Sequence, residues 1–195
     1  MAFKKVYIPC DAIARKEDFE IWYEDGALFA NVKSPWESEK SKVDFIGRSG
    51  GLIARIKPDY KALAYDIRVD EWTYTLFTYT IFRHYFFQGM LWQMLGSISS
   101  GKAEFKNENT ERKDVTITRM NFKGHGECYE VRVRDLDKLR AAAAVTVGMM
   151  IKEEYKGLSS GEPNDKAGFL KKMVRNVWER GYTYEEIQEN PDITK

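Results

Sequence analysis

The sequence predicts a mainly β fold with some α-helix: an antiparallel sheet closed into a barrel around a buried central helix, with further helices towards the C-terminus. Three observations support this prediction. Aromatic and β-branched residues gather in the first two thirds of the 195 residues, which favours strands. No charged residue occurs from 141 to 151, so a helix there must be enclosed by protein on every side. A closed barrel encloses such a helix and leaves no exposed sheet edge.

Two hairpins are expected in the first sixty residues. In the first, Phe19, Ile21 and Tyr23 alternate with the residues between them, and Asp25-Gly26 supplies a two-residue turn. In the second, strands at 43–46 and 52–56 flank a turn rich in glycine and serine. This hairpin ends near Pro58, because proline cannot donate a hydrogen bond to a neighbouring strand.

Later strands show the same alternation. The expected strands cover 66–72, 74–87, 114–122 and 128–135. The second of them carries aromatic residues and threonine on both faces, which is typical of a strand that is covered on both sides. In the last, Tyr129, Val131 and Val133 are expected to face inward, and the charged residues between and after them outward.

After residue 134 the pattern becomes that of a helix. Asp135 and Asp137 suit the N-terminal turn of a helix, and Gly157 suits the position just beyond its last turn. The alanines at 141–144 and Gly148 keep this helix slim. We therefore expect it to fill the interior of the barrel.

The last part of the sequence is expected to be a separate helical tail. Residues 158–165 have the composition of a linker and divide a barrel domain, 1–157, from the tail, 166–195. The tail carries an apolar stripe at helical spacing with basic residues beside it, so it can lie in a membrane interface, dock on the barrel or mediate self-association. The stripe consists of Phe169, Leu170, Met173, Val174, Val177 and Trp178, and the basic residues are Lys171, Lys172 and Arg175.

Two segments resemble the tubby C-terminal-like superfamily, which includes tubby domains, the plant LURP-one-related proteins and the phospholipid scramblases. The segment VDFIGRSGGLIARI, 43–56, is similar to a recurring aspartate, turn glycine and apolar strand of that superfamily. The segment LDKLRAAAAVTVGMMI, 136–151, is similar to its central helix. The resemblance implies a barrel of about twelve strands around a buried helix. It also implies contact with membrane lipids, although no lipid-binding residue of tubby can be carried over to a position here.

Two local segments have features of sites for other chemistry. Gly96, Gly101 and Lys102 have the spacing of a phosphate-binding loop, but Ala103 stands where a magnesium-binding hydroxyl is needed, so a turn between strands is expected. His125 and Cys128 are three residues apart on one segment and point to opposite faces of a strand, so no metal site is expected. No linear catalytic signature and no cofactor motif is present, which leaves catalysis without positive support.

The charge of the chain excludes a global attraction to nucleic acid, because 31 basic residues face 30 acidic ones. A local basic stripe is expected on two strands that can pair, where it would bind a phosphate or an anionic lipid headgroup. The alternative is a solvated face balanced by Glu111, Asp114 and Glu130. The basic stripe consists of Arg112, Lys113, Arg119, Lys123, Arg132 and Arg134.

The function expected first is a non-enzymatic binding module that recognises an anionic lipid or another anion at the cytoplasmic face of a membrane. The alternative is a structural or protein-interaction domain that assembles through its C-terminal helices. A third hypothesis is an enzyme with its site in the mouth of the barrel. The first residues lack the apolar region of a secretory signal, and 141–151 is too short to span a bilayer, so a cytoplasmic protein is expected.

Overall fold

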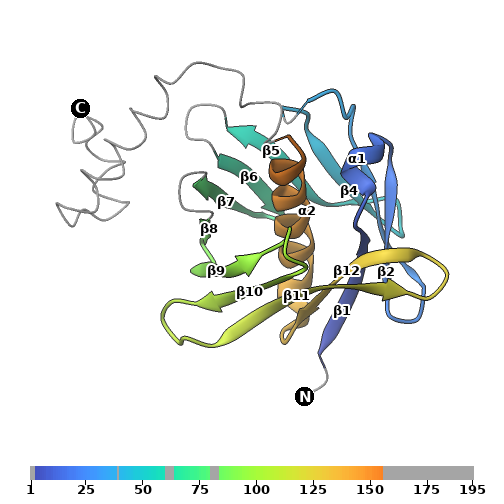
Figure 1. The fold of residues 1–195 in the computed structure, drawn as a ribbon. Helices are drawn as coiled ribbons and strands as arrows, with labels where there is room; N and C mark the ends of the chain where they lie inside the picture. The colour runs from blue at the N-terminus through green and yellow to red at the C-terminus, as the bar shows by residue number, and fades with distance from the viewer. Residues whose placement is uncertain (1–2, 39, 60–63, 80–83, 156–195) are drawn as a thin grey trace. The chain divides into compact units, whose positions relative to one another are not determined.

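In the described part of the chain, twelve antiparallel strands close into a barrel (Figure 1). The structure is a computed structural model that describes residues 3–38, 40–59, 64–79 and 84–155. Each strand pairs with the next along the sequence, and β1 closes the barrel by pairing with β12. The strands are β1 (Lys4–Pro9), β2 (Phe19–Tyr23), β3 (Leu28–Lys33), β4 (Val43–Gly47), β5 (Leu52–Asp59), β6 (Ala64–Val69), β7 (Trp72–Tyr79), β8 (His84–Gln88), β9 (Trp92–Ser97), β10 (Lys102–Asn107), β11 (Lys113–Phe122) and β12 (Gly126–Val133).

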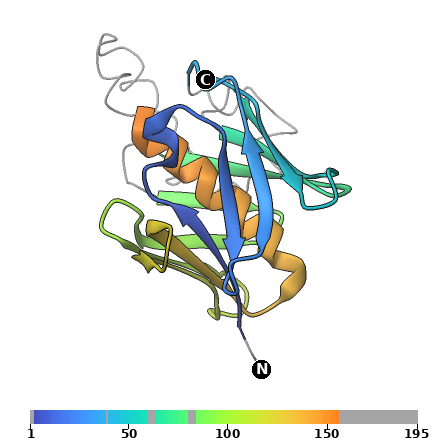
Figure 2. The ribbon, with the colours of Figure 1, turned by 90° about the vertical axis from the view of Figure 1, so that its right-hand side faces the viewer.

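The helix α2 (Leu139–Tyr155) is buried around its whole circumference over most of its length. Ala141, Ala142, Ala143 and Ala144 all have no exposed surface, although successive residues of a helix point in directions about 100° apart. The helix packs on β1, β5, β6, β7 and β12, and the two ribbon views show strands on either side of it (Figures 1 and 2). Two shorter elements, α1 (Ala12–Arg15) and η1 (Leu136–Lys138), pack against it.

Small residues allow this helix to pack closely against the strands. A Cβ atom added at Gly148 would lie 3.1 Å from Cδ2 of Leu76, and within 4 Å of Ile67 and Ile56. The hydroxyl of Thr146 is buried and donates a hydrogen bond of 2.7 Å to the carbonyl of Ala142. This bond removes the cost of burying an unpaired hydroxyl inside an apolar core.

The alternation expected for the last strand is confirmed. Tyr129, Val131 and Val133 are buried in the core. The outward residues differ from simple solvated charges, because Glu130 is only 8% exposed. The carboxylate of Glu130 accepts a hydrogen bond of 3.0 Å from Tyr7 and one of 2.8 Å from Arg132.

The single strand expected at 74–87 is wrong. The structure has two strands there, β7 and β8, which pair antiparallel with Thr75 opposite Gln88 and Tyr79 opposite His84. The intervening residues, 80–83, lie outside the described residues. The sequence offered no glycine, proline, asparagine or aspartate at this point, so the chain reversal had no turn signal.

The expected cap at the start of the helix is also different. Asp135 makes no side-chain capping bond, and η1 precedes α2 as a tight turn of 3₁₀-helix. The carboxylate of Asp135 instead lies 3.3 Å from the ammonium of Lys138. The linker at 158–165 and the helical tail at 166–195, with all the site residues predicted there, lie outside the described residues.

The segment with the spacing of a phosphate loop is a turn between β9 and β10, as expected. Gly96 and Gly101 both adopt positive φ angles, 87° and 80°. The hydroxyl of Ser100 donates a hydrogen bond of 2.8 Å to the carbonyl of Ser97 and so holds the turn together.

Candidate ligand-binding site

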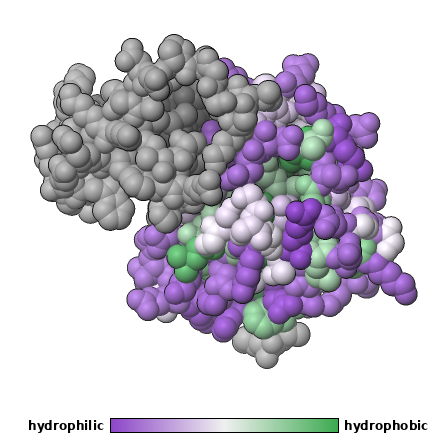
Figure 3. Space-filling model, in the orientation of Figure 1, coloured by the Kyte–Doolittle hydropathy of each residue, from purple (hydrophilic) through white to green (hydrophobic). Residues whose placement is uncertain are grey.

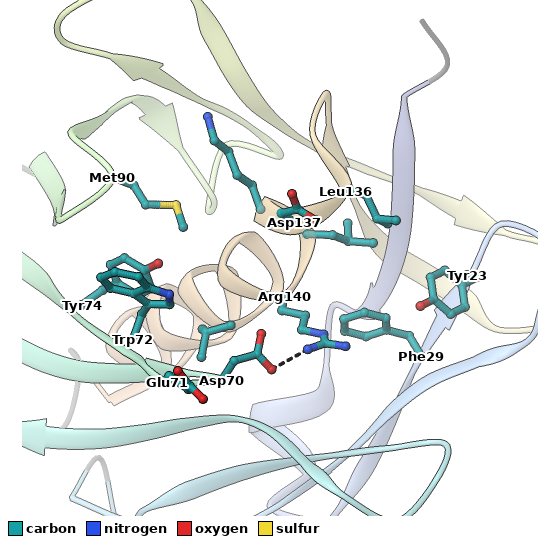
Figure 4. A pocket seen from close by; sticks show the side chains of 13 residues that line it. Tyr23, Phe29, Asp70, Glu71, Trp72, Tyr74, Met90, Leu136, Asp137 and Arg140 are labelled. Carbon is teal, nitrogen blue, oxygen red and sulfur yellow. Dashed lines mark hydrogen bonds and ion pairs between the residues drawn. The ribbon is translucent and has the colours of Figure 1, made fainter.

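A cavity of about 660 Å³ opens at the end of the barrel where η1 leads into α2 (Figure 4). We call it the mouth cavity. Its lining comes from the turns β2–β3, β6–β7 and β8–β9 and from the start of α2. The lining residues are Tyr23, Phe29, Val69, Asp70, Glu71, Trp72, Tyr74, Met90, Leu136, Asp137, Lys138, Leu139 and Arg140.

The β6–β7 turn places an aromatic side chain at the rim of the mouth cavity. Val69 pairs with Trp72, so only Asp70 and Glu71 connect the two strands. Asp70 has a φ of 52°, a conformation that aspartate tolerates better than most residues. Arg68 donates a hydrogen bond of 3.2 Å from Nε to the carbonyl of Asp70, which secures the turn. The side chain of Trp72, the first residue after this turn, is 70% exposed.

The start of α2 is held in place by a buried carboxylate. Asp114 is 5% exposed, and one of its oxygens accepts bonds from Nζ of Lys138 at 2.9 Å and from the indole of Trp92 at 3.1 Å. Burial alone would raise the pKa of Asp114. The hydrogen bonds from Lys138 and Trp92, together with the positive charges of Lys138 and Arg112, outweigh burial, so the pKa lies below its ordinary value. This anchor fixes η1 and leaves Leu136 56% exposed at the rim.

Both cations of the lining are already engaged by carboxylates. Arg140 forms an ion pair of 2.5 Å with Asp70, which ties α2 to the β6–β7 turn (Figure 4). Lys138 is shared between Asp114 and Asp135. Among the described residues, no ion pair or side-chain hydrogen bond is formed by the carboxylates of Glu71 and Asp137. The mouth cavity therefore carries a surplus of negative charge.

Exposed apolar side chains are concentrated at this end of the barrel. Seven large hydrophobic residues are well exposed in the described part of the chain, and Tyr23, Leu52, Trp72 and Leu136 lie at the end where the mouth cavity opens. On the face seen in Figure 3, by contrast, hydrophilic residues predominate and apolar ones form small separate areas. A gathering of exposed apolar residues at the rim of a cavity is typical of a binding site.

The basic residues predicted as an anion site lie on paired strands, but they form two groups instead of one site. β11 and β12 pair along their length, as expected. However, Lys113 and Arg119 are six residues apart on β11, which separates them by about 20 Å at the usual rise of a strand. Arg112 and Lys113 therefore lie towards one end of the barrel, and Arg119 and Lys123 towards the other.

Acidic neighbours neutralise four of these six basic residues. The ammonium of Lys113 lies 2.8 Å from Glu104, and Arg132 lies 2.8 Å from Glu130. Arg112 pairs with Asp114 and Asp135, and Arg119 pairs with Glu127. The guanidinium of Arg134 instead stands 5.7 Å from the ring centre of Phe3. Anion binding by this stripe stays a prediction.

The residues of the mouth cavity were not identified as a site from the sequence. In the sequence, Trp72 ends the strand expected at 66–72, and Asp137 suits the N-terminal turn of a helix. The acidic pair Asp70-Glu71 between two apolar runs was the available turn signal. The possible metal ligand His125 lies elsewhere, with its ring 4.0 Å from that of Trp22.

A comparison with models of known protein families found no match, and a comparison with curated proteins found none either. The described part of the chain is a closed twelve-stranded antiparallel sheet followed by a helix. A solved X-ray structure of a protein from Arabidopsis thaliana has a similar fold, with a TM-score of 0.55 and 14% sequence identity. The match covers 75% of this chain and 89% of the plant chain. At this identity the likeness shows a shared fold alone. Within the described residues, no helix has the length and apolar character needed to cross a membrane.

Proposed function

We propose that the protein is a non-enzymatic binding module of the tubby-like superfamily, with α2 as the plug of its barrel and the mouth cavity as its ligand site. The carrying observation is the combination of a cavity of about 660 Å³ with exposed Trp72 and Leu136 at its rim. A volume in this range accepts a small organic molecule, and the apolar rim offers it contact area. Because α2 fills the interior, a ligand has access to the end of the barrel and not to its axis.

Binding of indole, a neutral aromatic probe, tests the site. We expect indole to shift the NMR signals of the Trp72 indole N–H and of the backbone of η1. Leu136→Ala should weaken binding about tenfold, because a leucine contact contributes 1 to 2 kcal/mol. Leu95→Ala is the matched control, since Leu95 is also exposed but lies outside the lining. Equal binding by both variants, or shifts spread over the whole surface, would contradict the proposal.

A second candidate function is attachment to an anionic membrane surface at its cytoplasmic side. One observation favours it: Phe3 is 44% exposed, and the guanidinium groups of Arg132 and Arg134 lie 5.6 and 5.7 Å from its ring centre. An exposed aromatic ring with flanking cations suits the interface of a bilayer with acidic lipids.

Sedimentation with vesicles tests this second candidate. The protein should co-sediment with phosphatidylserine vesicles and less as salt is raised, because the attraction is screened. Arg134→Ala should lower the bound fraction, and Lys16→Ala, which removes an exposed cation elsewhere, should not. Equal binding to vesicles of phosphatidylcholine alone would exclude electrostatic attachment. Self-association through 166–195 remains the alternative expected from the sequence, and it concerns residues outside those described.

A further inference from the structure

We propose that the mouth cavity selects an organic cation: a small molecule that joins an ammonium group to an aromatic or aliphatic group. The inference rests on the proposed function and adds the charge of the ligand. Three features of the lining lead to it: the uncompensated carboxylates, the aromatic rings beside them, and the absence of an available cation among the described lining residues.

The charge of the lining decides the sign of the ligand. Asp70, Glu71 and Asp137 contribute carboxylates, whereas Lys138 and Arg140 contribute the cations. Arg140 is bound to Asp70, and Lys138 is bound to two carboxylates outside the lining. An entering anion would therefore meet Glu71 and Asp137 with no described lining cation left to receive it. An entering cation would instead meet carboxylates that have no described ion pair.

The aromatic side chains also favour a positively charged ligand. Tyr23, Phe29, Trp72 and Tyr74 all line the mouth cavity, and the faces of such rings attract cations. Tyr23 and Phe29 already contact each other edge to face, with ring centres 5.3 Å apart. Trp72, on the same face of β7 as Tyr74, is 70% exposed and presents the largest ring. Indole is the aromatic ring that binds cations best.

The N-terminus of α2 does not reverse this preference. The first turn of a helix attracts anions through its free N–H groups. Here η1, which precedes that turn, carries Asp137, and Arg140 in the first turn of α2 is occupied by Asp70. The helix end is thus supplied with negative charge by the protein itself.

A series of three probes with the same ring tests the inference: benzyltrimethylammonium, benzyl alcohol and benzoate. Affinities are measured from the shift of the Trp72 indole N–H signal. We expect benzyltrimethylammonium to bind about tenfold more tightly than benzyl alcohol, because cation–ring and carboxylate contacts together supply that factor. Benzoate should bind more weakly than both. Added salt should lower the affinity for benzyltrimethylammonium and leave that for benzyl alcohol unchanged.

Charge-removing variants show which groups set the preference. Glu71→Gln and Asp137→Asn should each lower the affinity for benzyltrimethylammonium about threefold to tenfold. The affinity for benzyl alcohol should stay the same. Glu17→Gln removes an exposed carboxylate outside the cavity and should change neither. Unchanged benzyl alcohol binding also demonstrates that the cavity is intact in each variant.

Two results overturn the inference in distinguishable ways. If benzyl alcohol or benzoate binds as tightly as the cation, or if Glu71→Gln and Asp137→Asn leave cation affinity unchanged, the cationic preference is wrong and the binding module stands. If none of the three probes, nor indole, shifts the Trp72 signal, the mouth cavity is not a ligand site and both proposals fail.

Discussion

Replacement of any one of Ala141, Ala142, Ala143 and Ala144 by lysine is expected to unfold the protein. All four side chains are fully buried, and together they point to every side of α2. A lysine at any of them places an unpaired ammonium in an apolar core, at a cost of several kcal/mol. Domains have a total stability of about 5 to 15 kcal/mol, so this cost removes most of it. Urea denaturation followed by circular dichroism measures the loss.

Glu154→Lys provides the control for this series. It introduces lysine into the same helix at an exposed position, so the free energy of unfolding should change by less than about 0.5 kcal/mol. Stability close to that of the unmodified chain in one of the four alanine variants would identify a side of α2 that is open to water. That result would remove the plug from the proposed architecture.

Gly96→Ala is expected to destabilise the barrel by about 3 kcal/mol. At Gly96 the φ angle is 87°, and an added Cβ would lie 2.6 Å from the backbone carbonyl oxygen of Lys102. A left-handed conformation alone costs a residue with a Cβ about 1 to 2 kcal/mol. The contact with Lys102 adds overpacking, and backbone atoms paired between β9 and β10 cannot move aside.

Gly124→Ala separates these two causes. Gly124 has a φ of 85°, but no atom lies within 4 Å of the Cβ position. Its replacement should therefore cost only the conformational part, about 1 kcal/mol. The two variants are compared by their urea midpoints. Equal losses of stability would mean that the close contact with Lys102 does not contribute to the destabilisation by Gly96→Ala.

The barrel was predictable because its main signals are local. The alternation in 128–133 and the glycine in the β2–β3 turn each act within one hairpin. The burial of the middle of α2 was also predictable, because 141–151 contains no charged residue and so offers no side that favours water. The boundary between β7 and β8 was not, since the aromatic and threonine residues continue to the end of β7 and resume in β8.

The candidate site was far less predictable, because its properties depend on residues distant in sequence. The positive charge of Lys113 is balanced by the carboxylate of Glu104 on β10, and that contact requires the register of two strands. The mouth cavity likewise brings residue 23 beside residue 140. A tryptophan in an aromatic strand indicates a core position. Its exposure at residue 72 follows only from its place at the rim of the barrel.

The seam between β1 and β12 constrains how the molecule acquires its shape during translation. Lys4 pairs with Val133, so β1 lacks its partner on one side until β12, the last strand of the described barrel, has been synthesised. The helix α2, which follows β12 in the sequence, emerges later still. The nascent sheet therefore stays open at β1 until β12 has been made, and closure of this seam, a contact of long sequence separation, is expected to be a late step of folding.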